Sequence, residues 1–170
     1  GQASAFNAGV LQTSGEIICF LDSDDFCYPQ RVEHIVSKYR EAAWGLLCHH
    51  LHEVDTHEHP IRNLTHAQIT NSTLMSCNLE ELLHEHDLAW VFSPTSGMNL
   101  PAELAKKIFP IPEDKWRICA DSPLAVASIC HASVGVIDEA LGAYRLHDLN
   151  AFASARDDRI EMQIHHIRIN

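Results

Sequence analysis

The spacing of apolar and polar positions along the chain predicts alternating helices and strands. Apolar residues recur at helical spacing over residues 2–13 and a stop signal follows at Gly15, so we expect an amphipathic helix there. The apolar run at 17–21 has the length and composition of a strand that is buried on both faces, as in a parallel sheet. Pro29 is placed for the first turn of a second helix. The apolar stripe of that helix consists of Val32, Ile35, Val36 and Tyr39.

The same reading extends to the end of the chain. A strand at 45–51, a polar turn at 54–58 and a return through Pro60 and Ile61 indicate a hairpin. Further elements are expected as helices at 78–87, 101–108, 122–131 and near the C-terminus, and as a strand at 134–137. No repeat, linker or low-complexity segment is visible, so the pattern predicts one α/β domain over residues 1–170.

The composition fits one compact domain and excludes two kinds of partner. With 170 residues, 46% of them hydrophobic, the chain can bury a sizeable core. Twelve Lys and Arg against 23 Asp and Glu give a net charge of -11, the wrong sign for binding nucleic acid or an anionic membrane through charge. An anionic substrate would therefore need a metal ion or a local cluster of donors. Six cysteines without a C-x-x-C pair favour a reducing compartment, so we expect a cytoplasmic location, with the cytoplasmic face of the membrane as an alternative.

Three carboxylates, those of Asp22, Asp24 and Asp25, directly follow the apolar run at 17–21. The carboxyl end of a strand in an α/β sheet is where such folds bind ligands. Carboxylates held this close repel one another unless a cation, a ligand hydroxyl or helix amides compensate the charge. Capping of the following helix would explain one of the three and leaves two.

Two known motifs, one calcium-binding and one enzymatic, fit this loop in part. A calcium-binding EF-hand would use Asp22, Asp24 and Glu33, but Phe26 and Cys27 occupy loop positions that need an acidic residue and Gly, and a strand precedes the loop. A haloacid-dehalogenase-like phosphatase would use Asp22 as nucleophile and Asp24 as general acid. That family, however, has Thr or Val where this chain has Phe26, and its fold begins with the strand, whereas a helix comes first here.

A third resemblance covers about thirty positions. The segments GQASAFNAG at 1–9 and SGEIICFLDSDD at 14–25, with Pro29 after them, resemble the centre of family-two glycosyltransferases of the GT-A fold. The resemblance implies a Rossmann-like α/β domain with a mixed, mainly parallel sheet. It also implies a divalent metal, Mn or Mg, bound by Asp24 and bridging the diphosphate of a nucleotide sugar. Asp22 would contact the donor ribose or sugar, and Asp25 would belong to the same substrate-binding loop.

Two later segments extend the resemblance. The stretch from Phe109 to Leu124 is similar to the region that holds the family's general base, a role that falls to Asp121, although Asp121 as an ordinary helix cap is the alternative. Relatives often have a second acid before this Asp, and this chain has Ala120 there, which leaves Glu113 and Asp114 as lesser candidates.

The segment YRLHDLN at 144–150 resembles the family's Y-R-x-H-x-x-N signature. By that resemblance His147 would approach the metal or diphosphate, and Arg145 would donate to phosphate or to the acidic loop. Ser96 and Gly97 lie in a small-residue stretch that resembles the loop beneath the donor sugar and acceptor.

A cluster of histidines suggests a separate metal site. His49, His50, His52, His57 and His59 fall within eleven residues. His50 and His52 would share one face of a strand, as zinc ligands can. We favour instead a flexible, His-rich surface around the predicted hairpin.

Together these features predict an inverting, metal-dependent glycosyltransferase of the hexosyltransferase type. The donor would be a nucleoside-diphosphate sugar, with a UDP-sugar favoured, and the acceptor a hydroxyl of a glycan, lipid or other molecule. A phosphatase using Asp22 and Asp24, or a module that binds a sugar nucleotide or glycan without turnover, is the alternative.

The family's first βα units, which bind the nucleotide base, have no counterpart in this chain. We therefore expect 1–170 to be the central and C-terminal part of the domain. Alone it would be inactive, would bind nucleoside diphosphates weakly, and would expose a sheet edge that favours self-association.

Overall fold

The computed structural model describes residues 1–64, 93–148 and 150. Four helices are found in these residues: α1 (Gln2–Gln12), α2 (Arg31–Glu41), α4 (Ala102–Ile108) and α5 (Asp121–His131). The strands are β1 (Ile17–Cys19), β2 (Phe26–Cys27), β3 (Leu46–Val54), β4 (Pro60–Leu64), β5 (Met98–Pro101) and β6 (Val134–Arg145). A single 3-10 turn, η3 (Thr95–Gly97), leads into β5. The predicted α/β class is confirmed.

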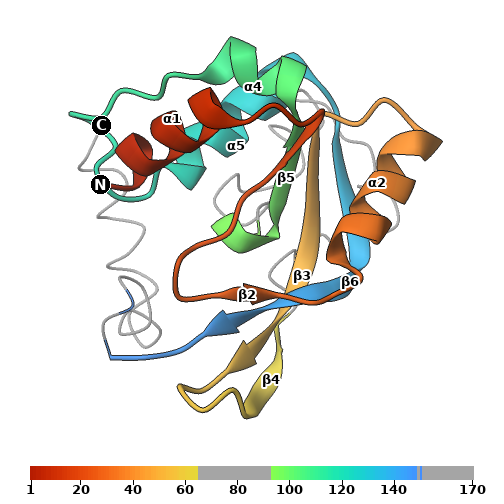
Figure 1. The fold of residues 1–170 in the computed structure, drawn as a ribbon, viewed down its shortest axis with the longest axis vertical. Coiled ribbons are helices and arrows are strands. Elements are labelled where there is room, and N and C mark those ends of the chain that lie inside the picture. The colour runs from red at the N-terminus through yellow and green to blue at the C-terminus, as the bar shows by residue number, and fades with distance from the viewer. Residues whose placement is uncertain (65–92, 149, 151–170) are drawn as a thin grey trace, which may run out of the picture.

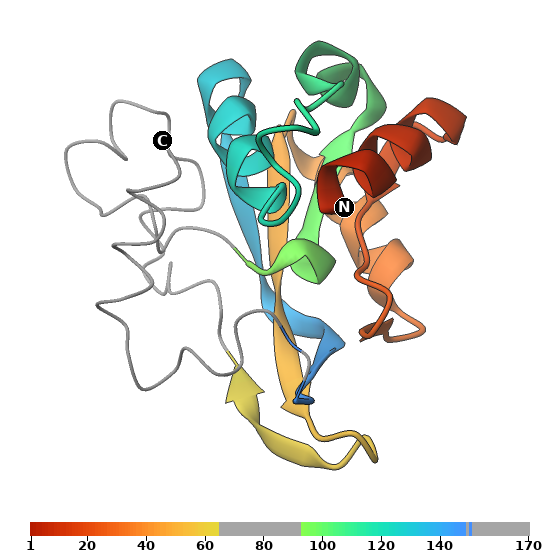
Figure 2. The same ribbon diagram turned by 90° about the vertical axis from the view of Figure 1, so that its left-hand side faces the viewer.

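The strands form one mixed sheet in the order β1-β5-β3-β6-β2, with β4 paired to β3 as the predicted hairpin. The central pair, β3 and β6, is parallel. The other pairs in the described sheet are antiparallel. Figures 1 and 2 show β3 and β6 side by side, and they are the longest of the described strands.

Helices cover both faces of this sheet. Helices α1, α4 and α5 enclose the main core, in which Phe6, Leu104 and Leu124 meet the apolar side chains of β1, β3 and β5. Helix α2 lies on the opposite face, where Ile35 packs against Ile137 and Leu141 of β6 (Figure 1). Burying each such side chain contributes about 1.5–3 kcal/mol. The two helix layers therefore hold the carboxyl end of β1 and the end of β6 in fixed positions.

Three details of the predicted elements are corrected. Strand β1 pairs antiparallel with β5, and only one of its faces is buried, since Ile18 is enclosed while Cys19 is exposed. Val32 is 60% exposed, because α2 contacts the sheet through a stripe narrower than its apolar pattern. Pro29 precedes α2 in a turn rather than occupying the first helical turn.

The histidines of β3 are not a flexible surface. His49 and His50 are 0% and 6% exposed, because β3 lies between β5 and β6 in the sheet. Burial lowers the pKa of His49 to about 4, so this side chain is neutral. Only His57 and His59, in the turn of the hairpin, are exposed as predicted.

Two predicted helices, at 78–87 and near the C-terminus, lie outside the described residues. Within those residues no helix combines the length and apolar character of a membrane span. The five cysteines there are all unbridged.

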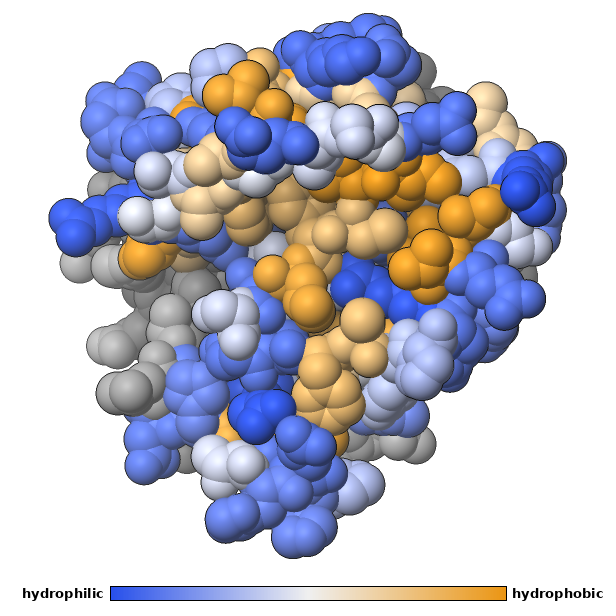
Figure 3. Space-filling view, viewed as in Figure 1, coloured by the Kyte–Doolittle hydropathy of each residue, from blue (hydrophilic) through white to orange (hydrophobic). Residues whose placement is uncertain are grey.

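An apolar surface remains between α1 and α2 (Figure 3). The large exposed hydrophobic residues of α1, α2 and the loop after β1 include Leu11, Val32 and Leu21, at 80%, 60% and 46% exposure. Strand β1 has a single partner, β5, in the described sheet, so its other edge has no strand beside it there. This surface has the character that self-association would require, and self-association stays a prediction.

Candidate active site

The acidic loop lies between β1 and β2 and borders an open pocket of about 460 Å³. Five segments far apart in the sequence supply the pocket's lining: the start of α1, the acidic loop, the stretch before β5, the stretch around the start of α5, and the stretch around the end of β6. Asp22, Asp24 and Asp121 all line it. The fold therefore brings the predicted general base and the acidic loop to one cavity.

Asp22 is the carboxylate most affected by its neighbours. Burial, and then the negative charges of Asp25 and Asp121, raise its pKa to about 6. Its backbone N–H donates to Oγ of Ser96 at 3.0 Å, which fixes the start of the loop. Burial and the same cluster of carboxylates raise the pKa of Tyr144, on the pocket wall, to about 12. The pocket therefore carries a negative field that a cation would relieve.

Replacing Asp22 with Asn is predicted to raise the thermal stability of the protein when divalent metals are chelated. The charged form of Asp22 is disfavoured in the folded state, so at neutral pH its charge opposes folding, and the substitution removes that repulsion. Thermal melts in chelator would measure the shift. Asp148→Asn, at an exposed position, is the control and should melt like the unaltered protein. A lower melting temperature for Asp22→Asn than for the control would contradict the repulsion.

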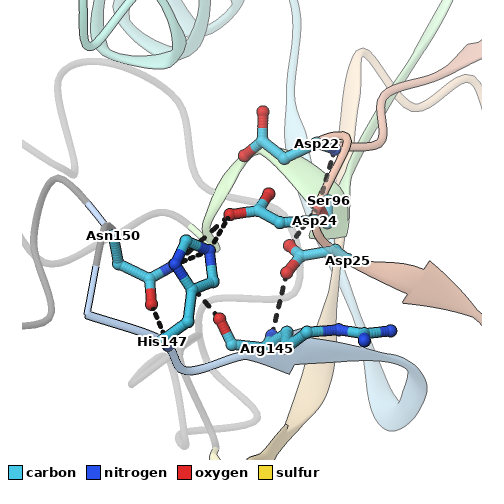
Figure 4. Close-up of polar contacts among 7 residues, drawn as sticks. All are labelled: Asp22, Asp24, Asp25, Ser96, Arg145, His147 and Asn150. Carbon is cyan, nitrogen blue, oxygen red and sulfur yellow. Dashed lines mark hydrogen bonds and ion pairs between the residues drawn. The ribbon is translucent and has the colours of Figure 1, made fainter. Parts of the chain in front are cut away.

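Asp25 is buried and stabilises the acidic loop through hydrogen bonds. It is 8% exposed and accepts hydrogen bonds from Oγ of Ser96 at 2.5 Å and from the backbone N–H of Arg145 at 2.9 Å (Figure 4). Burial raises its pKa, and these hydrogen bonds act in the opposite direction. Asp25 thus ties together the acidic loop, the stretch before β5 and the end of β6. A direct contact of Asp25 with substrate stays a prediction.

Asp24 faces the segment after β6. Its Oδ2 lies 2.9 Å from Nε2 of His147 and 3.3 Å from Nδ2 of Asn150 (Figure 4). Asn150 in turn accepts from the backbone N–H of His147 at 2.6 Å and donates to the carbonyl of Arg145 at 3.1 Å. The residues of the Y-R-x-H-x-x-N segment therefore hold the His147 imidazole against the acidic loop, and an approach of His147 to a metal or diphosphate stays a prediction.

Arg145 acts through its backbone, which corrects the prediction for its side chain. Its guanidinium extends away from the acidic carboxylates (Figure 4), donates to Glu58 at 3.1 Å and lies 5.7 Å from the ring centre of Phe26. The only group of Arg145 that donates to the acidic loop in the described structure is its N–H, on Asp25. A guanidinium contact with phosphate would require a different rotamer.

The loop before β5 presents different residues from those predicted. Ser96 is 0% exposed and Gly97 is buried, and neither lines the pocket, whereas Pro94 and Thr95 do. Ser96 instead links Asp22 to Asp25. The predicted substrate contacts at Ser96 and Gly97 are thus replaced by a supporting role beneath the pocket floor.

Gly97 is required by close packing, so Gly97→Ala is predicted to destabilise the protein by about 1–3 kcal/mol. A Cβ at this position would lie 1.8 Å from Oγ of Ser93 and 2.7 Å from the carbonyl oxygen of His49, and the latter belongs to the central strand. Chemical denaturation would measure the loss. Gly9→Ala is the control, since a Cβ there meets nothing within 4 Å. Equal stabilities of the two variants would contradict the packing argument.

Asp121 is the first residue of α5, and its carboxylate is directed by neighbours on both sides. Oδ2 is 3.4 Å from the hydroxyl of Thr95, and Oδ1 accepts from the N–H of Ser122 at 3.0 Å. The N-cap residue of α5 is Ala120, which has no side chain to cap the helix, so the bond from Ser122 to Asp121 is made within the first turn. The lesser candidates, Glu113 and Asp114, do not line the pocket, and Glu113 accepts from Asn7. Among the three predicted acids, the position of Asp121 fits a general base best.

No group of three or more His, Cys, Asp or Glu side chains in residues 1–64, 93–148 and 150 is arranged to hold a metal ion. The arrangement that comes nearest is the pair Asp24 and His147. Neighbouring ligands in an octahedral shell, each about 2.1 Å from Mg²⁺, lie about 3 Å apart. The 2.9 Å between Oδ2 of Asp24 and Nε2 of His147 is the length of a hydrogen bond, so a bound ion would take the place of the proton between these two atoms. Two protein ligands are what such ions use when substrate phosphates complete the shell.

Sequence reasoning missed two residues at the pocket. Gln2 and Thr95 both line it, and they hydrogen-bond to each other at 3.0 Å. Thr95 lies in the small-residue stretch before β5, where its residue type did not distinguish it from Ser96. Gln2 gave no signal, because its partners are 93 and 118 positions away in the sequence.

Comparisons with known proteins agree on one family. The family model described as Glycosyl transferase family 2 matches residues 1–96. An uncharacterized glycosyltransferase of Nostoc sp. is 32% identical over 163 residues, which cover 96% of this chain and 49% of that protein. The chain therefore spans about half the length of this curated relative.

Solved structures of S. aureus TarS share the fold. The complex with UDP superposes with a TM-score of 0.63 at 19% identity, over 86% of this chain and 40% of TarS 1-349. The complex with UDP-GlcNAc gives a TM-score of 0.62 at 17% identity, over 88% of this chain and 40% of that chain. The family match over more than half of the residues, the Nostoc relative and the site geometry lead to one conclusion: this chain belongs to glycosyltransferase family 2.

Proposed function

We propose that this chain carries the metal-binding loop and the general base of an inverting glycosyltransferase. The observation that supports this most strongly is that Asp24, whose carboxylate is hydrogen-bonded to His147, and Asp121 line the same pocket. A phosphatase that uses Asp22 and Asp24 has no support from the family match.

The residues of the pocket fit a divalent ion, Mn or Mg. Asp24 and His147 would hold it, and the raised pKa of Asp22 reflects its burial first and then the negative charges around it. When bound, such an ion neutralises charge on a departing diphosphate. The chain's net charge of -11 makes this compensation necessary for an anionic donor.

The donor is proposed to be a nucleoside-diphosphate sugar, with a UDP-sugar favoured. Support comes from the structural neighbour, which was crystallised with UDP and with UDP-GlcNAc. Asp22, which lines the pocket, is proposed to contact the donor's ribose or sugar hydroxyls. The acceptor is proposed to be a hydroxyl of a glycan, a lipid or another molecule.

Asp121 is proposed as the general base. The acceptor oxygen forms its bond to the anomeric carbon while the bond from that carbon to the diphosphate oxygen breaks, and the hydroxyl proton passes to the Asp121 carboxylate. An attack opposite the leaving group inverts the anomeric configuration. Proton removal of this kind contributes roughly 10²–10⁴ in rate.

A donor screen with the full-length gene product tests the proposal. Nucleoside diphosphate released from UDP-, GDP- and other sugar nucleotides would be measured with Mn and with chelator. We expect release from one donor class that depends on the metal. Binding of a donor without release would favour a non-catalytic module, and release of inorganic phosphate from phosphomonoesters would favour the phosphatase.

A further inference from the structure

The carboxylate of the proposed base is connected to α1 by a chain of hydrogen bonds. Nε2 of Gln2 donates to Oγ1 of Thr95 at 3.0 Å, and Oγ1 of Thr95 lies 3.4 Å from Oδ2 of Asp121. Oε1 of Gln2 accepts from the backbone N–H of Ala120 at 2.7 Å. One side-chain amide therefore contacts both the residue before Asp121 and the hydroxyl beside its carboxylate.

The orientation of the Gln2 amide follows from its partners. A backbone N–H is only a donor, so the atom of Gln2 that meets Ala120 must be the oxygen. The NH₂ group is then the atom that faces Thr95. Gln2 itself is fixed at the start of α1, since its own N–H donates to the carbonyl of Arg117 at 2.8 Å.

This orientation decides where the Thr95 proton goes. Thr95 is 1% exposed, so water does not compete for its hydroxyl. Its oxygen accepts from Gln2, and the one proton it carries is then directed at the pocket carboxylates. Asp121 is one of these, and a hydrogen bond from Thr95 also lowers the pKa of Asp22, against the stronger effects that raise it. A single donor thus stands between two carboxylates that repel each other.

We propose that Gln2 and Thr95 are positioning residues for Asp121. Gln2 sets the direction of the Thr95 hydroxyl and anchors the chain at Ala120, and Thr95 holds the Asp121 carboxylate toward the acceptor side of the pocket. Neither residue exchanges a proton with substrate. The inference rests on the proposed function, because it assigns Asp121 the role of base.

Three substitutions in the full-length protein test whether Gln2 and Thr95 position the Asp121 carboxylate or only fill space beside it. Thr95→Val keeps the shape and removes the donor, whereas Thr95→Ser keeps the donor. Gln2→Glu keeps the size of the side chain but has no NH₂ group, so Thr95 would donate to Glu and turn away from Asp121. For each variant, kcat, the donor KM, Mn affinity and melting temperature would be measured in the nucleoside diphosphate release assay.

We expect Thr95→Val and Gln2→Glu to lower kcat by about 10- to 100-fold, the loss that one hydrogen bond to a charged group gives. In Thr95→Val, donor KM and Mn affinity should stay unchanged, and Thr95→Ser should retain kcat within about threefold of the unaltered protein. If Thr95→Val fails to fold, Gln2→Glu decides the question.

Two outcomes would overturn this inference and leave the proposed function standing. One is a normal kcat in folded Thr95→Val or Gln2→Glu, which lack the hydrogen bond to Asp121. The other is a kcat in Thr95→Ser that is as low as in Thr95→Val. Failure of the proposed function would give a different result: the unaltered protein would release no nucleoside diphosphate from any sugar nucleotide. The inference about Gln2 and Thr95 would then fail as well.

Discussion

Asp24→Asn is expected to abolish transfer and to weaken Mn binding by on the order of 100-fold or more, because it removes the charged partner of His147 in the proposed metal site. The fold should be nearly unaffected. Asp24 lies in a half-exposed loop, and a pair of this kind contributes at most about 1 kcal/mol.

Isothermal titration with Mn in the presence of UDP would measure the first effect, and a thermal melt the second. Asp148→Asn is the matched control, since Asp148 is exposed and does not line the pocket. Unchanged Mn affinity in Asp24→Asn would remove Asp24 from the metal site.

Asp121→Asn is expected to lower kcat by roughly 10²–10⁴ while the donor KM and Mn affinity stay close to those of the unaltered protein. The amide cannot accept the acceptor's proton, but it keeps the size of the side chain, and its oxygen can still accept from the N–H of Ser122 at the start of α5. Steady-state kinetics with varied donor and acceptor would separate the two effects.

Asp114→Asn provides the control for this prediction, because Asp114 was a lesser candidate for the same role and lies away from the pocket. It should keep full activity. A loss of activity in Asp114→Asn, or a variant at Asp121 that melts early but turns over normally per folded molecule, would mean that Asp121 only supports the helix.

The residues that the sequence identified best are those whose role depends on residue type and local spacing. Asp24, Asp121 and His147 were each indicated by a motif; Asp24 and Asp121 line one pocket, and His147 is hydrogen-bonded to Asp24. Local spacing also located the helices and strands, because the apolar periodicity of each element reflects the face that it buries.

The sequence was less informative where a side chain's partners are distant in the chain. Asp25 receives its second hydrogen bond from Arg145, 120 positions away, so its supporting role could not be read from the acidic loop. The Arg145 guanidinium turns toward Glu58 for the same kind of reason. Burial of Ser96 depends on how the loop before β5 seats against β3, which a run of small residues does not specify.

Strand pairing shows the same limit. The apolar run of β1 indicated a strand but not its neighbour, and β5, its antiparallel partner, begins 79 positions after β1 ends. His49 and His50 were misjudged because the polar character of the segment gave no sign that β3 would be the central strand.

A manganese anomalous difference map from crystals of the full-length protein with Mn and UDP tests the central claim most directly. The proposal predicts a single strong peak within bonding distance of Asp24 and His147, with the diphosphate on the pocket side of the ion and Asp121 facing the same pocket. A peak at another position, or UDP bound with no metal at Asp24, would contradict it.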